Sequence, residues 1–188
     1  MRAAYEQIAP LVQRCIGAAG DFAEFGVCRG VTFLPLAEAA RAAGKRCHAV
    51  DSFQGCAEPS LKDYNPDGSC DCPRGALGVG GSREFRKLVE PLDGHVRVWE
   101  GWVPAILKEM AAEVGQLAFA HLDLDQYEAT LAGLRWCWPR MSPGGILCCH
   151  DWFPHYTQLA SRAIRDWMAE ADVEPSGATD TRHIWFQG

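Results

Sequence analysis

Three carboxylates follow two short apolar segments and indicate where the chemistry of this chain takes place. Asp123 and Asp125 end the apolar run 117–125, and Asp151 comes near the end of the run 144–152. Buried strands of parallel sheets are nearly continuous apolar runs, and open α/β sheets bind ligands beyond the carboxyl ends of their strands. The three side chains are therefore expected around one crevice, where their oxygen atoms could hold a divalent cation.

A second candidate site follows residues 22–28, which are expected to form a strand that turns into a helix. Gly26 and Gly30 would let the backbone approach a ligand closely. The full G-x-G-x-x-G pattern is absent, so a dinucleotide is not indicated. Asp51 ends the next predicted strand, 25 residues after Gly26, where α/β folds place the acid that binds ribose hydroxyls. A loop carboxylate or helix cap is the alternative interpretation of Asp51.

The elements that position these residues alternate along the chain. Helices are expected over residues 3–19, 30–43, 82–89, 102–114, 126–138 and 155–170. Strands are expected over residues 22–28, 47–53, 95–101, 117–125, 144–152 and 183–187. This alternation predicts an α/β fold with a doubly wound, mostly parallel, Rossmann-like sheet and helices on both faces. A length of 188 residues predicts a single domain over residues 1–188.

Composition and charge narrow the class of protein. The formal net charge is −6, whereas nucleic-acid phosphates select a basic face, so no nucleic-acid partner is expected. No run of 18 apolar residues occurs, so no membrane span is expected. An N-terminus without a signal-peptide core predicts a cytoplasmic protein whose nine cysteines are reduced.

Residues 54–81 form a long polar segment, rich in Gly, Pro, Asp and Ser, which is expected to be a mobile binding loop. It contains Cys56, Cys70 and Cys72. We interpret these cysteines mainly as mobile loop thiols. A zinc site is the less favoured alternative, because Cys70 and Cys72 form C-x-C rather than the usual C-x-x-C pair.

Four motifs, taken together and in this order, resemble the macrocin O-methyltransferase family: FAEFGVCRG (22–30), VDSFQG (50–55), HLDLDQYEATLAGL (121–134) and PRMSPGGILCCHDW (139–152). The resemblance implies a class I enzyme that uses S-adenosylmethionine to methylate a hydroxyl of a small molecule, such as a sugar or another natural product. In that family a glutamate-glycine turn and an Asp-Ser-Phe strand end hold the cofactor. By position, this implies Glu24, Gly26, Asp51, Ser52 and Phe53.

The resemblance also implies a divalent cation, usually magnesium, held here by Asp123 and Asp151. His150 stands where the family usually has another acid, and imidazole suits manganese, iron or zinc better than magnesium. Both direct ligation by His150 and a purely orienting role are left open. Trp152, next to Asp151, is expected to border the acceptor site.

Methyl transfer to an alcohol needs activation of a weak nucleophile. A metal ion that binds the hydroxyl oxygen lowers the pKa of the hydroxyl. A nearby base then removes the proton. Asp125 is the first candidate base, because it lies two residues beyond Asp123 on the same strand face. His150 and His155 are alternatives. Asp125 could instead cap the helix that follows it.

Two other functions stay open at this point. The same carboxylates could serve a metal-dependent hydrolase or sugar-modifying enzyme, and the chain could be a cofactor-binding or partner subunit without turnover. The sequence is short for the resembled family, so its substrate pocket could be open or completed by a second copy. A homo-oligomer is therefore among the expected states.

Overall fold

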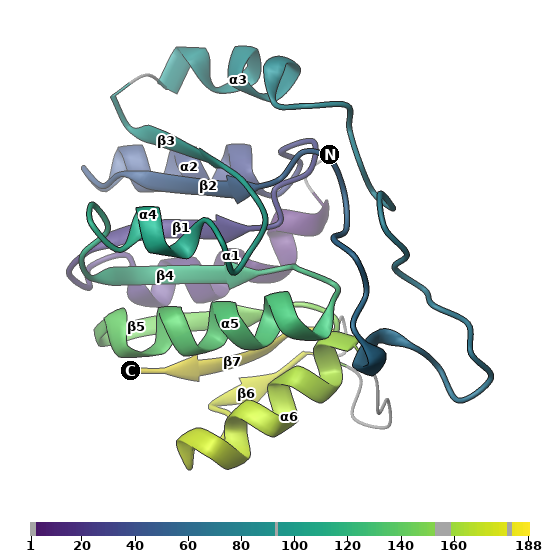
Figure 1. Cartoon of the computed structure of the whole chain (residues 1–188). Helices are drawn as coiled ribbons and strands as arrows, with labels where there is room; N and C mark the ends of the chain where they lie inside the picture. Colours follow the sequence, from purple (N-terminus) through teal and green to yellow (C-terminus); the bar gives the residue numbers. More distant parts are fainter. Residues whose placement is uncertain (1–2, 93, 153–158, 180–181) are drawn as a thin grey trace.

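Within the described residues (3–92, 94–152, 159–179 and 182–188), the computed structural model has a seven-stranded sheet at its centre (Figure 1). Its strands are β1 (Asp21–Phe25), β2 (Cys47–Asp51), β3 (Val96–Glu100), β4 (Leu117–Leu122), β5 (Met141–Cys149), β6 (Gly177–Ala178) and β7 (Ile184–Gln187). They lie in the order β3-β2-β1-β4-β5-β7-β6. The pairs from β3 to β5 are parallel, and β7 is antiparallel to both of its neighbours. The predicted α/β, mostly parallel sheet is confirmed.

Helices cover both faces of this sheet, as predicted (Figure 1). The α-helices are α1 (Ala3–Cys15), α2 (Phe33–Ala42), α3 (Arg83–Val89), α4 (Leu107–Met110), α5 (Tyr127–Cys137) and α6 (Leu159–Ala171). Short 3-10 helices are η1 (Leu61–Asp63), η2 (Glu90–Leu92) and η3 (Trp138–Arg140). Among the helices of the described residues, none has the length and apolarity that a membrane crossing requires.

Two apolar cores, one on each face, hold the layers together. The core with α1, α2 and α3 contains Phe22, Phe33 and Phe119, whereas the core with α4, α5 and α6 contains Met110 and Trp167. β4 is buried along its whole length, because it has strand neighbours on both sides and helices on both faces. A rigid central strand of this kind fixes the positions of the residues that follow it.

The segment before β4 departs most from prediction, because the helix expected over residues 102–114 is reduced to α4. Residues on either side of α4 form hydrogen-bonded turns instead, such as that from Ile106 N–H to the Trp102 carbonyl at 3.1 Å. Pro104 lies in the first of these turns. Other hydrogen bonds of this segment join residues three apart, such as that from Glu113 N–H to the Met110 carbonyl at 3.0 Å, which is the pattern of turns rather than of an α-helix.

The carboxyl ends of β1, β2 and β4 meet at one edge of the sheet, where the strands also end earlier than predicted. β1 stops at Phe25 and β4 at Leu122, so Asp123 and Asp125 lie in the connection to α5 rather than in a strand. The chain between β2 and α3 runs along this same edge toward the start of α5 (Figure 1). The predicted site residues therefore lie along this edge of the sheet.

Candidate active site

A cleft opens at the carboxyl ends of β1, β2 and β4. Its lining includes five of the residues predicted from sequence, namely Gly26, Asp51, Ser52, Asp123 and Asp125. The loop 54–81 and the segment after β3 close its other sides. The structure thus brings together positions that are up to about one hundred residues apart in the chain.

The turn after β1 depends on glycine for a reason that differs from the one expected. Gly26 has φ of +88°, and a Cβ atom there would collide with the carbonyl oxygen of Asp123. Gly30 has φ of +77°, and a Cβ atom there would lie 3.0 Å from the ring of Phe85. The close approach at both glycines is therefore to the protein itself, and Gly30 lies outside the cleft lining. Gly26 packs the β1 turn directly against the first metal-site candidate.

Asp51 holds two tight turns of the cleft. Its Oδ2 accepts a hydrogen bond from Cys28 N–H at 2.7 Å, and its Oδ1 accepts one from Phe53 N–H at 2.6 Å. Cys28 and Phe53 both have positive φ, 47° and 55°, a conformation that side chains other than glycine rarely adopt. Each carboxylate oxygen has two lone pairs, so Asp51 keeps acceptor capacity toward the cleft.

The other predicted cofactor residues lie at different depths. The Ser52 hydroxyl donates to the Gly55 carbonyl at 2.9 Å and so shapes the cleft wall. The Phe53 ring is buried against Phe85, 5.1 Å between centroids, beneath the cleft. Glu24 is 1% exposed, and its Oε1 lies 3.0 Å from His121 Nδ1. Burial raises the pKa of Glu24 despite this contact. The cofactor-binding roles assigned to these residues stay predictions.

Asp123, His150 and Asp151 form a compact cluster at the ends of the adjacent strands β4 and β5. His150 Nδ1 lies 3.0 Å from Asp123 Oδ1 and 3.1 Å from Asp151 Oδ1. Burial opposes protonation of His150, but the two carboxylates outweigh it and raise the pKa of His150 to about 10. His150 also lowers the pKa of Asp123 against the effect of burial. His150 Nδ1 thus lies between the two carboxylates that were predicted to hold a cation.

Asp125 faces the same cleft beside this cluster. Burial, followed by the charges of Asp123 and Asp151, raises the pKa of Asp125 to about 8. Asp125 and Asp151 have positive φ, 59° and 58°, and such backbone conformations tend to cluster at ligand sites. His155, the other candidate base, lies outside the described residues.

The helix-cap interpretation of Asp125 is wrong, because a residue from the loop 54–81 takes that place. Tyr127 N–H, at the start of α5, donates to Asp63 Oδ1 at 2.6 Å, and Gln126 is the N-cap residue without a side-chain cap. Sequence reasoning missed Asp63 because 64 residues separate it from Tyr127. The only local signal is the capping box that Asp63 forms with Ser60.

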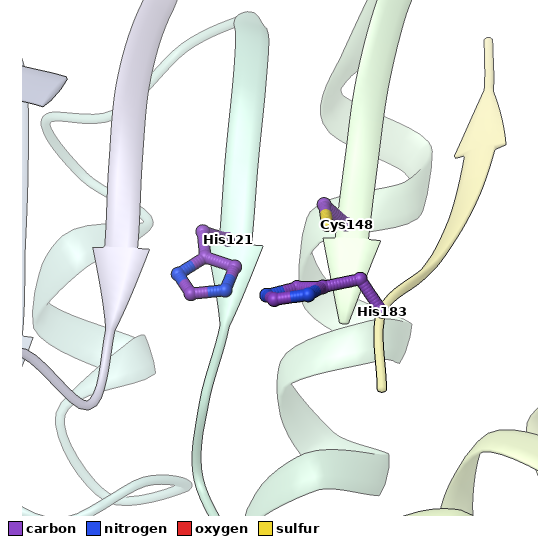
Figure 2. Close-up of side chains that lie close together, drawn as sticks. All are labelled: His121, Cys148 and His183. Carbon is purple, nitrogen blue, oxygen red and sulfur yellow. The ribbon is translucent and has the colours of Figure 1, made fainter. Parts of the chain in front are cut away.

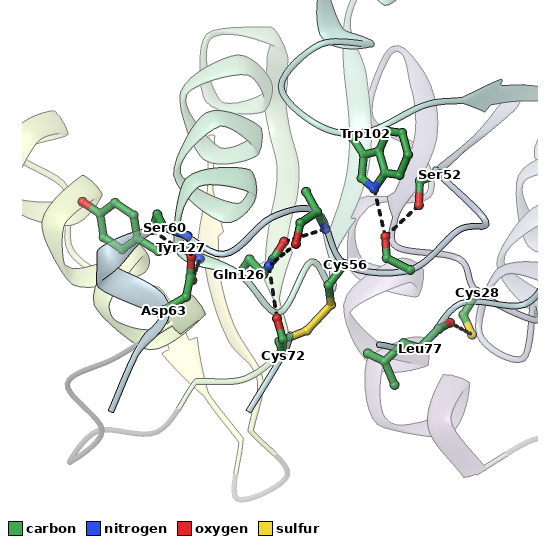
Figure 3. Close-up of a disulfide and its surroundings, with 12 residues drawn as sticks. Cys28, Ser52, Cys56, Ser60, Asp63, Cys72, Leu77, Trp102, Gln126 and Tyr127 are labelled. Atoms are coloured by element: carbon green, nitrogen blue, oxygen red, sulfur yellow. Dashed lines mark hydrogen bonds between the residues drawn. A yellow bond between two sulfur atoms is a disulfide. The ribbon is translucent and has the colours of Figure 1, made fainter. Parts of the chain in front are cut away.

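The prediction of free thiols is wrong for two of the three loop cysteines, since Cys56 and Cys72 form a disulfide (Figure 3). Gln126 brings their segments together: its Oε1 accepts from Ala57 N–H, and its Nε2 donates to the carbonyls of Ala57 and Cys72, at 3.0, 3.0 and 3.2 Å. Cys70 stays a free thiol. Cys56 and Cys72 are bonded to each other and are therefore not free to bind zinc. The expectation that these two thiols are reduced does not hold.

Two tryptophans border this region. Trp102 was not predicted as a site residue, but it is 39% exposed, lines the cleft and donates from Nε1 to the Gly55 carbonyl at 2.9 Å. A position just after a strand end was the available signal. Trp152, expected at the acceptor site, is half-buried and packs against the core with α4, α5 and α6.

Comparison with known proteins agrees with this geometry. Residues 23–152 match a family model described as "Methyltransferase domain". The chain is 33% identical over 144 residues to 8-demethyl-8-(2,3-dimethoxy-alpha-L-rhamnosyl)-tetracenomycin-C 4'-O-methyltransferase of Streptomyces olivaceus, covering 72% of this chain and 54% of that protein. It is 32% identical over 178 residues to demethyldecarbamoylnovobiocin O-methyltransferase of Streptomyces niveus, covering 89% of this chain and 66% of that protein. The chain thus spans between half and two thirds of these relatives' lengths.

A solved structure has the same fold. The crystal structure of CalS11, a calicheamicin methyltransferase, superposes with a TM-score of 0.81 at 21% sequence identity, over 98% of this chain and 78% of that one.

Proposed function

This chain belongs to the methyltransferase family whose model matches residues 23–152, and we propose that it transfers a methyl group from S-adenosylmethionine to a hydroxyl of a small molecule. The observation that carries this proposal is the placement of Asp51 and Asp123 on one cleft. Asp51 stands where α/β folds bind ribose, and Asp123 begins the polar cluster that can receive a hydroxyl. Donor and acceptor would therefore meet within one cavity.

We assign the donor side of the cleft to the β1 turn and the end of β2. The Asp51 carboxylate would accept hydrogen bonds from the ribose hydroxyls, and Ser52 and Gly26 would border the same ligand. Glu24, Gly30 and Phe53 lie outside the cleft lining and would hold these residues in position. The residues fit an adenosyl ligand because the cleft offers an acidic acceptor beside apolar walls, among them Val50 and Val103. S-adenosylmethionine supplies an activated methyl group when bound there.

We assign the acceptor side to Asp123, His150 and Asp151. One ligand atom from each lies within 4.8 Å of the others, and two carboxylates with an imidazole are a donor set that fits a divalent cation. Asp123 and Asp151 would hold magnesium or another divalent cation, with His150 as a third ligand after loss of its Nδ1 proton. Such a cation supplies positive charge that lowers the pKa of a hydroxyl.

The proton of the acceptor hydroxyl needs a base near the point of methyl transfer. Asp125 fits this role by geometry, because it lines the cleft beside Asp123. Without the cation, His150 contacts both Asp123 and Asp151 and so orients their side chains for ligation. A cation held by Asp123 and Asp151 would favour the ionised form of Asp125, which would take the proton as the hydroxyl oxygen accepts the methyl group.

The acceptor class follows from the relatives. Their names describe methylation of a rhamnosyl tetracenomycin and of a novobiocin precursor, so we propose a hydroxyl on a sugar or comparable natural product. This agrees with the proposed membership of the macrocin O-methyltransferase group. A cytoplasmic location and a homo-oligomeric state belong to the same proposal.

Two measurements test the proposal. Calorimetric titration with S-adenosylhomocysteine should show one site per chain, and incubation with a panel of rhamnosyl glycosides and labelled S-adenosylmethionine should yield labelled ether products. Asp151→Asn should strongly lower methyl transfer while leaving affinity for S-adenosylhomocysteine unchanged, because Asp151 serves the acceptor side. Binding without turnover on every glycoside would favour a cofactor-binding subunit instead. Full activity of Asp151→Asn, or of the wild type in excess chelator, would remove the cation from the mechanism.

A further inference from the structure

A second cluster of ligating side chains lies buried on one face of the sheet, outside the lining of the cleft. His121 on β4, Cys148 on β5 and His183 just before β7 are each at most 3% exposed. One ligand atom from each lies within 4.8 Å of the others. Figure 2 shows the two imidazole rings pointing toward one another with the Cys148 sulfur beside them.

The strand register explains why these side chains meet. Glu24, His121 and Cys148 are paired neighbours across β1, β4 and β5, so they form a row on one face of the sheet. His183 enters from the chain that leads into β7, which pairs with β5. Parallel strands about 4.8 Å apart bring side chains of one row within reach of a common ion.

The orientation of His121 suits ligation. Its Nδ1 lies 3.0 Å from Glu24 Oε1, while its Nε2 is buried and has no hydrogen-bond partner among the described residues. In metal sites a carboxylate commonly receives one ring N–H of a histidine and directs the other nitrogen at the ion. Glu24 has the same relation to His121, and a cation beside His121 would compensate the charge of this buried carboxylate.

We propose that His121, Cys148 and His183 bind a soft or borderline transition-metal ion, zinc by preference, on this buried face of the sheet. Thiolate and imidazole ligands select such ions rather than magnesium or calcium. Zinc bonds of about 2.0–2.3 Å place ligand atoms roughly 3–4 Å apart, which this cluster reaches with small side-chain shifts. With zinc, the Cys148 thiolate and the Glu24 carboxylate, the formal charges sum to zero.

The ion would connect three strands and reach the neighbourhood of the proposed acceptor site. The His183 ring lies 5.5 Å from the His121 ring and 4.9 Å from the His150 ring, between centroids. An ion held by His183 would therefore fix the ring against which His150 packs. Because the ligands are buried, the ion would enter during folding.

Expression in minimal medium supplemented with zinc or with cobalt tests this site. The background should carry Cys28→Ser and Cys70→Ser, because Cys28 is exposed and Cys70 half-buried, and either could bind metal from solution. After exhaustive dialysis against chelator, elemental mass spectrometry should find about one zinc per chain, and the cobalt protein should show a thiolate-to-metal charge-transfer band. Cys148→Ala should lose both signals. Glu24→Gln should lower metal affinity about 10- to 100-fold.

Cys149→Ala is the matched control, because Cys149 is the next residue of β5, is equally buried and faces the other core. It should keep the metal. The proposal is overturned if the folded background protein carries no metal, or if the cobalt protein lacks the thiolate band, whether or not Cys148→Ala folds. Retention of the metal in folded Cys148→Ala would also overturn it. None of these readouts depends on methyl transfer.

Discussion

Replacement of Asp63 by alanine should destabilise the protein more than its place in a polar loop suggests. Asp63 is 2% exposed. Its carboxylate accepts three hydrogen bonds, from Tyr127 N–H at 2.6 Å and from the N–H and hydroxyl of Ser60, both at 2.8 Å. The alanine variant would leave the first N–H of α5 and the Ser60 N–H without this acceptor.

The size of the effect follows from these contacts. Loss of a helix cap costs about 0.5–2 kcal/mol, and a hydrogen bond to a charged group contributes about 1.5–3 kcal/mol. Ser60 is only half-buried, so water replaces part of its interaction. We expect a loss of about 3 kcal/mol in the free energy of unfolding, which corresponds to a Tm lower by about 6–12 °C for a chain of this length.

Urea denaturation followed by tryptophan fluorescence measures this loss, and limited proteolysis reports whether the loop 54–81 is released. Asp67→Ala is the control, because Asp67 lies in the same loop, is exposed and accepts hydrogen bonds only from Ser69 among the described residues. The control should change stability little. Equal midpoints for the two variants would refute the assignment of Asp63 as the cap of α5.

Two further predictions concern the cleft. Asp51→Ala should weaken binding of S-adenosylhomocysteine, measured by calorimetry, by about 1.5–3 kcal/mol, which is roughly 10- to 150-fold. Glu58→Ala serves as the control, because Glu58 is exposed. Unchanged affinity in a folded Asp51→Ala variant would remove Asp51 from the site. Joint replacement of Cys56 and Cys72 by serine should lower the free energy of unfolding by about 3 kcal/mol, as for other closed loops of about 15 residues, and should speed proteolytic cleavage within the loop. The control variant Cys70→Ser should change neither quantity. Equal cleavage rates for the two variants would show that the disulfide does not hold the loop.

Local patterns in the sequence were sufficient to predict most of the elements. The apolar run that became β4 and the helical spacing within α6 reflect which faces are buried, and burial repeats with the period of each element. The helix over residues 102–114 was predicted too long, because the apolar spacing around Ile106 and Met110 continues through the turns on both sides of α4. Periodicity reports burial, and it does not report where backbone hydrogen bonds stop.

The site was predictable where it depends on strand ends and not where it depends on distant side chains. Asp123 and Asp151 could be placed together because they end consecutive segments of a parallel sheet, although their roles stay predictions. The position of His150 between Asp123 and Asp151 could be seen only in the folded structure. The pairing of Cys56 with Cys72 could not be deduced either, since it depends on a loop that folds around Gln126.

The contacts between the loop 54–81 and α5 have a consequence for the order in which the protein folds. Gln126 pairs with Ala57, Tyr127 with Asp63 and, through its hydroxyl, with Lys62, across 64 to 69 residues of chain. These contacts join the loop to the start of α5, so they can form only where α5 already lies on the sheet. We therefore expect the cleft to be completed after α5 has packed, and hydrogen exchange in the loop 54–81 to be faster than in β4.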